Sequence, residues 1–314
     1  MRSGWRAVTF LSCIFCLSAV SAWGDGEGPA FGYSTAILGP GNASIETTFM
    51  WRSGVTMFGP QLSYGLMENL QISVSASFHL DHGDLPTGRF TAMMPGDPQV
   101  EVILGWRFFH KSPAIGTRNE ATLYGGVSAL TQDVPRADGP PLRRQPGYYV
   151  AAAAGHVSRR YDVWVGAGYQ GYGTWSRGVD DRQSNSVLTS LVVGWRPPFF
   201  DHDYPKPDVR FFWETTGGVI GQAQRGVAPP GSTGGHDEGT APPPPPPNSS
   251  GIVVLPNSGG TGVFSGPTFL CTYRNVAFQG GVLFALWNQP NGVQPSEKVR
   301  AVAGVTYYFL RGRR

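Results

Sequence analysis

The stretch LQISVSASFHLDH, residues 70–82, alternates apolar and polar residues almost to its end. Successive side chains of a β-strand point to opposite faces, so this period of two predicts a strand with one apolar and one polar face. The same alternation returns at residues 100–109, 163–172 and 299–309. A soluble sandwich and a membrane barrel both contain such strands, so the fold depends on whether the apolar faces meet a protein core or lipid.

Twelve stretches with strand character follow one another along the chain, separated by turn-forming residues. They cover residues 43–53, 55–65, 69–81, 97–110, 119–132, 147–158, 161–173, 184–196, 207–220, 261–274, 276–288 and 298–310. Several reach the roughly 9–11 residues that a tilted strand needs to cross a bilayer, whereas strands of soluble sheets average about 5–6 residues. The connections are alternately long and short in most cases, like the outer loops and periplasmic turns of bacterial outer-membrane barrels.

Composition favours lipid over a soluble core. Charged residues make up only 14% of the chain, against about a quarter in an ordinary globular protein. The polar faces are rich in Ser, Thr, Gly and Gln, and aromatic residues collect near strand ends, as interfacial girdles require: Trp51, Trp106, Trp195, Trp213, Tyr307 and Phe309. We therefore predict an all-β fold, a transmembrane antiparallel up-and-down β-barrel of about 12 strands (10–14), with its apolar faces turned to lipid.

Four stretches also carry a resemblance to a known family: FGPQLSYGLMENLQISVS (58–75), DVRFFWETTG (208–217), SGPTFLCTYRNVAFQGGVLFALWNQPNG (265–292) and GVTYYF (304–309). They resemble the outer-membrane proteins grouped as the "MetA-pathway of phenol degradation" family. The resemblance covers most of the chain from about residue 39 and consists of strand patterns, without a catalytic motif. It implies that small molecules, aromatic or hydrophobic ones among them, cross the outer membrane through the barrel.

The N-terminus has the pattern of a secretory signal peptide over residues 1–22. MRSGWR supplies the positive region, AVTFLSCIFCLSAV the apolar region, and VSA a cleavage site after Ala22. A lipoprotein signal ending at Cys13 and an uncleaved anchor helix are the alternatives. Cleavage after Ala22 leaves Cys271 as the one cysteine, which excludes an internal disulfide framework.

The rest of the chain divides into four parts. We expect an N-terminal periplasmic segment at 23–42, the outer-membrane barrel at 43–310 and a basic C-terminal tail at 311–314. The barrel includes a long Pro/Gly-rich extracellular loop at 221–260, where APPPPPPNSSG favours extended polyproline II. This proline tract is either a solvated loop or a docking site for a partner at the cell surface.

Charge gives no reason to expect a nucleic-acid partner. The net charge is +3, and arginines at the two ends account for it, so the body of the chain is near neutral. The expected partners are outer-membrane lipid, the barrel-insertion machinery and a small-molecule solute. The expected location is the outer membrane of a Gram-negative bacterium, and the expected state is a monomer.

Charged residues gather on the faces predicted to line the lumen, since charge on a lipid face is costly. They are Glu46, Arg52, Glu101, Arg107, Glu120, Asp162, Arg196, Arg210, Glu214 and Arg300. Both signs occur in similar number, so one interpretation is a network of salt bridges that braces the lumen. The other is a constriction that selects solutes by charge.

Aromatic residues also fall on the strand faces predicted to line the lumen: Phe109, Tyr124, Trp164, Tyr172, Phe212 and Trp287. They could form a path for apolar solutes, or they could simply fill space. A barrel of about twelve strands lies between the eight that side chains fill and the sixteen of an open porin, so strand number favours neither interpretation.

The sequence offers little for catalysis or metal binding. HLDHGD contains His79, Asp81, His82 and Asp84, but strand spacing puts the two histidines on opposite faces, so we predict a hydrated loop and no metal. DDRQSNSVLTS resembles the HQSNG segment of outer-membrane phospholipases, yet Arg182 stands where their histidine would be. A serine needs a neighbouring base to act as a nucleophile, so we predict no enzyme activity and no cofactor.

Three functions fit these observations. The first is an outer-membrane channel or transporter for small molecules. The second is a structural or adhesive barrel with a plugged lumen, and the third is an outer-membrane lipid hydrolase that uses Ser184. The width of the lumen separates the first from the second, and an assay of phospholipid hydrolysis separates the first from the third.

Overall fold

The structure is a computed structural model that describes residues 28–52, 55–80, 99–130, 134–136, 139–142, 145–173, 184–200, 206–226, 252–256, 258–292 and 296–310. The expected signal peptide, the proline tract and the basic tail lie outside the described residues.

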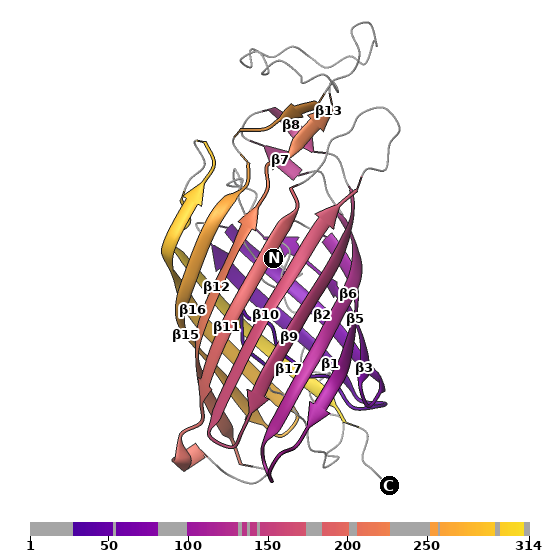
Figure 1. Ribbon diagram of the computed structural model, residues 1–314, viewed down its shortest axis with the longest axis vertical. Helices are drawn as coiled ribbons and strands as arrows, with labels where there is room; N and C mark the ends of the chain where they lie inside the picture. Colours follow the sequence, from indigo (N-terminus) through magenta and orange to yellow (C-terminus); the bar gives the residue numbers. More distant parts are fainter. Residues whose placement is uncertain are drawn as a thin grey trace, which may run out of the picture.

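Twelve antiparallel strands form a closed barrel (Figure 1). In chain order they are β1 (Ala43–Arg52), β2 (Val55–Met67), β3 (Leu70–Ala76) with β4 (Phe78–His79), β5 (Gln99–Lys111), β6 (Arg118–Leu130), β9 (Pro146–Val157), β10 (Tyr161–Tyr172), β11 (Ser186–Trp195), β12 (Asp208–Ile220), β15 (Gly260–Tyr273), β16 (Val276–Pro290) and β17 (Val299–Phe309). The sheet has 13 segments, and β3 and β4 are two pieces of one strand separated by Ser77. Pairing of β1 with both β17 and β2 closes the barrel and leaves no free sheet edge, which confirms the predicted fold class.

The short turns between β2 and β3, β9 and β10, and β15 and β16 lie at one end of the barrel (Figure 1). The opposite end, where β6 and β12 finish, is here called the long-loop end. Two small hairpins stand at the long-loop end, β7 (Val134–Arg136) with β8 (Gly139–Leu142), and β13 (Gln224–Gly226) with β14 (Ile252–Val254). The short 3-10 helix η1 (Pro198–Phe200) lies in the connection between β11 and β12, at the opposite end. Within the described part of the chain, no helix is both long and apolar enough to span a membrane.

The apolar faces point outward, as predicted. Strand β11 shows the alternation in full: Leu188 and Val192 are buried inside, while Val187, Leu191 and Trp195 are exposed on the outer surface. The opening stretch behaves in the same way, since Val74 and Phe78 are exposed and Ser73 and Ser77 are buried. A soluble monomer rarely exposes an apolar patch of more than a few hundred Å², so a band of this kind around the whole barrel is the surface of a transmembrane protein.

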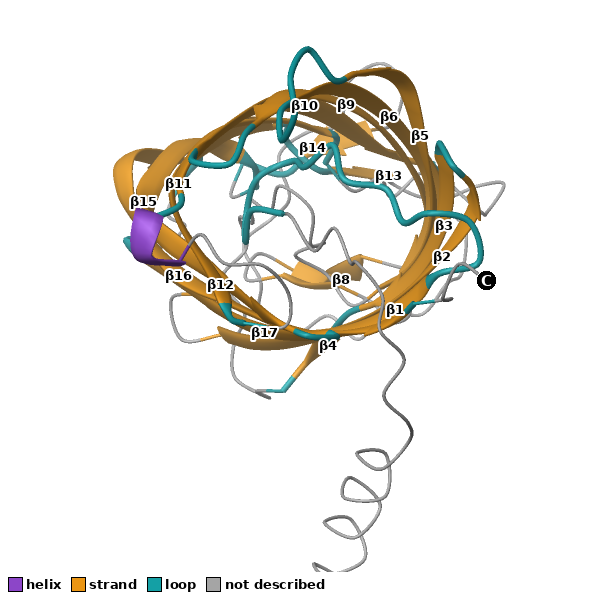
Figure 2. Cartoon of the chain, turned by 90° about the horizontal axis from the view of Figure 1, so that it is seen from below, coloured by secondary structure: helices purple, strands orange, loops and turns teal. Residues whose placement is uncertain are grey.

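Residues 28–42, here called the inserted segment, lie inside the barrel (Figure 2). This corrects the expectation of a periplasmic segment at 23–42 for its described part. Tyr33 is fully buried and packs against the inner face of β10 at Gly166 and Gly168. A Cβ atom at Gly166 would come within 2.5 Å of the Tyr33 side chain, so only glycine lets the inserted segment approach the wall so closely.

Candidate functional site

Most of the predicted lumen charges form ion pairs on the inner wall. Arg210 Nη1 lies 2.8 Å from Asp162 Oδ2, and both side chains are buried. Arg107 Nη1 lies 3.1 Å from Glu120 Oε1, which His110 Nδ1 also contacts at 3.0 Å. Arg196 pairs at 2.7 Å with Asp208, an acceptor that the sequence analysis did not select. This part of the lumen is therefore a braced wall of paired charges.

Arg52 and Arg300 share one carboxylate, that of Glu297. Arg52 donates from Nε and Nη2 at 3.0 and 2.7 Å, and Arg300 donates from the same two atoms at 2.7 and 3.0 Å. Burial alone would raise the pKa of the Glu297 carboxyl, but the two guanidinium groups together lower it to about 2. Glu297 belongs to the connection between β16 and β17, so strand parity gave no reason to select it.

Three predicted lumen carboxylates have no ion pair with a described cation: Glu46, Glu101 and Glu214. Glu46 accepts hydrogen bonds from Thr48 Oγ1 at 3.1 Å and Gln279 Nε2 at 2.8 Å. Glu101 accepts hydrogen bonds from Gln99 and Ser75. These partners are neutral, and of the three carboxylates Glu46 alone lines the cavity described below.

Glu214 holds the inserted segment. Its carboxylate accepts hydrogen bonds from the backbone N–H groups of Ala30, Phe31 and Gly32 at 2.7, 2.9 and 2.8 Å. Thr268 Oγ1 donates a further bond to the same carboxylate. Carboxylate bonds to backbone N–H groups are among the stronger hydrogen bonds in proteins, so Glu214 anchors the chain to the wall at β12.

The aromatic candidates Tyr124, Trp164 and Phe212 also face the lumen and are buried. Tyr124 Oη donates to the carbonyl of Ser34 at 2.6 Å, and Trp164 Nε1 donates to Thr35 Oγ1 at 3.2 Å. The Phe212 ring packs against Trp164. These three side chains therefore support the inserted segment. They do not line an open apolar path.

Tyr172 lies apart from them, at the long-loop end of the barrel. It is buried against Ala223 and Leu255, which flank the β13–β14 hairpin. Its role in the structure is to seat that hairpin on the barrel.

Two aromatic candidates, Phe109 and Trp287, were assigned to the wrong face. In β5 the pairing with β6 shifts between Arg107 and Phe109, and Phe109 is 45% exposed on the outside. In β16 the pairing with β15 shifts at Val263 and Phe264, and Trp287 is 46% exposed on the outside. Each shift is a β-bulge, and one extra residue in a strand reverses the face of every residue beyond it.

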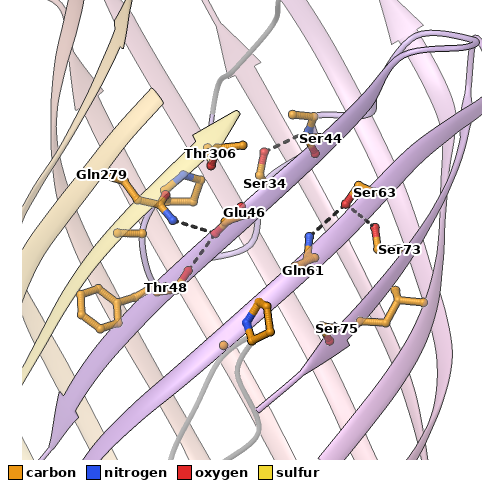
Figure 3. Close-up of a pocket in the computed structure, with 18 of the residues that line it drawn as sticks. Ser34, Ser44, Glu46, Thr48, Gln61, Ser63, Ser73, Ser75, Gln279 and Thr306 are labelled. Atoms are coloured by element: carbon orange, nitrogen blue, oxygen red, sulfur yellow. Dashed lines mark hydrogen bonds between the residues drawn. The ribbon is translucent and has the colours of Figure 1, made fainter. Parts of the chain in front are cut away.

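A cavity of about 240 Å³ remains between the inserted segment and the wall formed by β1, β2 and β3 (Figure 3). We call it the polar cavity, because the strands on one side of it contribute a set of hydroxyl and carboxamide groups. Its polar lining includes Ser44, Glu46, Thr48, Gln61, Ser63, Gln71, Ser73, Ser75, Gln279 and Thr306. Phe31, Met50 and Met57 border it on one side. Of the ten charged candidates, Glu46 and Arg300 reach this space.

The metal and serine motifs gain no support. Asp81, His82 and Asp84 lie outside the described residues, and the described residues contain no group of three metal-ligating side chains that could hold an ion. Ser184 lies just before β11 at the long-loop end. His110 and His156 bond to Glu120 and Asn119 near the short turns, at the other end of the barrel from Ser184.

Comparisons place the fold among known barrels. No family model matches the chain, and no curated protein matches it in sequence, so the family resemblance stays a prediction. An outer membrane channel from Pseudomonas putida F1 superposes with a TM-score of 0.54 at 13% identity, over 88% of this chain and 98% of that chain. At this identity the likeness shows a shared fold and nothing more.

Two further solved structures match more weakly. The NanC porin gives a TM-score of 0.40 at 11% identity, over 84% of this chain and 98% of that chain. LpxR from Salmonella typhimurium gives 0.43 at 9% identity, over 85% of this chain and all (100%) of that chain. Scores this low decide neither for a channel nor for an enzyme.

Proposed function

We propose that this protein is an outer-membrane channel through which small solutes pass beside the inserted segment. The observation that carries the proposal is the polar cavity, an unfilled space of about 240 Å³ inside a closed barrel. A barrel that served only as a scaffold would have no need to keep hydroxyl, carboxamide and carboxylate groups around an open space, because apolar side chains could fill the interior without the cost of burying polar groups. The fold, which is shared with an outer membrane channel, is compatible with this function.

The lining of the cavity favours small polar solutes. The aromatic side chains Tyr124, Trp164 and Phe212 pack against the inserted segment or each other, so they offer no continuous apolar surface. Passage of aromatic or hydrophobic compounds rests on the family resemblance alone. Contact with outer-membrane lipid, insertion by the barrel machinery, a monomeric state and the absence of enzyme activity belong to the same proposal.

Liposome swelling tests this function. Purified full-length protein, folded into liposomes, should admit glycerol and other solutes of a few carbon atoms and exclude solutes the size of a disaccharide. Liposomes without protein provide the baseline. Equal exclusion of glycerol by both preparations, with the barrel shown to be folded by circular dichroism, would contradict the proposal.

A structural barrel with a plugged lumen is the second candidate. The observation in its favour is the extent of packing around the inserted segment, where Tyr33 and Thr35 are completely or almost completely buried. This candidate predicts that the full-length protein admits no solute, and that passage appears only when the inserted segment is removed. The swelling assay therefore separates the two functions.

A further inference from the structure

The polar cavity has an ordered wall. Strand pairing places Thr306 of β17 opposite Glu46 of β1, Glu46 opposite Gln61 of β2, and Gln61 opposite Ser75 of β3. In antiparallel neighbours the side chains of directly opposite residues lie on the same face. Four neighbouring strands thus present one row of polar groups to the cavity, with a carboxylate near its centre.

A second row runs beside the first. Ser44, Ser63 and Ser73 are opposite one another on β1, β2 and β3. Ser63 Oγ lies 2.9 Å from Ser73 Oγ, and Gln61 Nε2 donates to Ser63 Oγ at 3.1 Å (Figure 3). Gln71 Nε2 donates to Ser73 Oγ at 3.0 Å. These bonds fix the side chains to one another and hold the wall in place before any solute arrives.

Glu46 differs from the other lumen carboxylates in its surroundings. Asp162, Glu120 and Glu297 each contact at least one arginine, and Glu214 is occupied by three backbone N–H groups. Glu101 has neutral partners as well, but it does not line the cavity. Glu46 instead has Thr48 and Gln279 as neighbours, lines the cavity, and retains partial exposure there. Gln61, Gln71 and Ser75 also keep partial exposure. The wall therefore presents acceptors and donors that a solute can reach.

The chemistry of these groups matches a solute that carries several hydroxyls. Hydroxyl and carboxamide groups both donate and accept hydrogen bonds, so they can pair with ligand hydroxyls in either direction. A carboxylate accepts from such hydroxyls with bonds about twice as strong as neutral ones. The wall spreads its polar groups over several strands, whereas a small cation would need charged ligands gathered around one position. Phe31 and Met57 border the space and can cover the C–H faces of such a solute.

We propose that the polar cavity is a binding site for a small polyhydroxylated solute, a polyol or monosaccharide, with Glu46 as its principal hydrogen-bond acceptor. This inference deepens the proposed channel function and rests on it for biological meaning, because the site would lie on the path of the solute. Binding can be measured without passage. An experiment can therefore contradict the binding site and leave the channel function standing, or the reverse.

Ligand-observed NMR titration of sorbitol and D-glucose against the detergent-folded full chain tests the inference. Both should give saturable transfer signals with millimolar affinity or better. Glu46→Gln should weaken that affinity roughly tenfold or more, since it removes one charge-assisted acceptor and leaves the shape of the side chain unchanged. The matched control is Glu68→Gln, which removes a carboxylate in the exposed turn between β2 and β3 that does not line the cavity, and should leave affinity within about twofold.

Several results would overturn the inference. One is the absence of a saturable signal from either solute with protein whose barrel is folded. A second is equal affinity in the wild type and Glu46→Gln. A third is binding of choline at much lower concentrations than sorbitol, which would make this a site for organic cations. If sorbitol binds as described but glycerol and sorbitol both fail to cross liposomes, the binding site stands and the channel function is wrong.

Discussion

Glu214 is the residue on which the position of the inserted segment depends most directly. Its carboxylate is buried and accepts hydrogen bonds from the backbone N–H groups of residues 30–32. Replacing it with alanine would leave three N–H groups without an acceptor, and each unsatisfied group costs about 1–3 kcal/mol. We expect Glu214→Ala to speed hydrogen exchange at residues 30–32 at least about tenfold, as measured by mass spectrometry.

Glu101→Ala is the control for this variant, because Glu101 has no hydrogen bond to the inserted segment among the described residues. Exchange at residues 30–32 should stay at the wild-type rate in that variant. Wild-type protection in Glu214→Ala would show that packing, and not this carboxylate, holds the inserted segment.

The ion pairs of Glu297 predict how the free energy of unfolding changes with pH. The arginine pair Arg52 and Arg300 lowers its pKa to about 2 from the ordinary value of 4.5. A lowered pKa in the folded state stabilises the fold above the ordinary pKa, and this contribution is lost as the pH falls from about 4.5 to 2. We expect wild type to exceed Glu297→Gln in unfolding free energy by about 3 kcal/mol at pH 6 and by almost nothing at pH 2.

Urea unfolding of both proteins across this pH range, followed by tryptophan fluorescence, measures the difference. A gap between the two proteins that stays constant from pH 6 to pH 2 would mean that the arginines do not act through the charge of Glu297. Lys298, the exposed next residue in the chain, offers a matched charge change as Lys298→Gln, which should show no such pH dependence.

At the residue scale, strand parity was enough to place most candidates. Glu46, Asp162 and Arg210 lie on the lumen face because the alternation in β1, β10 and β12 has no interruption around them. Phe109 and Trp287 could not be placed in this way, since each lies beyond a bulge. A bulge depends on how two strands pair, and it leaves no trace in the alternation of one strand alone.

At the element scale, the bulge in β16 gives a direct test of which face a tryptophan occupies. Trp287 is exposed on the outer surface, and Trp164 is buried in the lumen. Bromine-labelled lipid quenches only tryptophans that reach the bilayer. We expect Trp287→Phe to reduce the quenchable fraction of tryptophan fluorescence, and Trp164→Phe to leave the quenchable signal unchanged. The reverse outcome would mean that the β15–β16 register is wrong.

The inserted segment is the element that sequence reasoning placed in the wrong position. Residues 28–42 show neither helical nor strand periodicity, so the pattern gave no reason to put them inside the barrel. Their position depends on long-range contacts with Glu214, Ser190 and Gln71, which lie far along the chain or on other strands. A sign in the sequence was the presence of glycines on the lumen face, such as Gly166 and Gly168 of β10, which leave space for another part of the chain.

Removal of this element should widen the lumen. Deleting residues 28–38 keeps Gly39, Gly41 and Asn42, which precede β1 and make backbone hydrogen bonds to one another and to Gly65 of β2. We expect the deletion variant to admit a disaccharide in the swelling assay, which the full-length protein excludes. Unchanged exclusion by a folded variant would mean that the loops at the other end of the barrel, and not the inserted segment, set the size limit.

At the scale of the whole molecule, the sequence was sufficient for the architecture. Contact with lipid requires an apolar outer face on every strand, and the need to pair every backbone N–H and C=O group in the bilayer requires a closed sheet. Alternation and strand number together therefore predict a twelve-stranded barrel. What alternation cannot predict is whether the lumen is filled. That depends on how the inserted segment and the wall share the interior, and here they leave the polar cavity between them.

Single-channel recording in planar bilayers tests this account most directly. The full-length protein, at several salt concentrations, should produce small discrete current steps, and Glu46→Gln should change their ion selectivity because it removes a lumen carboxylate that has no described cation beside it. Silence from protein that is shown to be folded and inserted would contradict the account, and would make the molecule a plugged barrel.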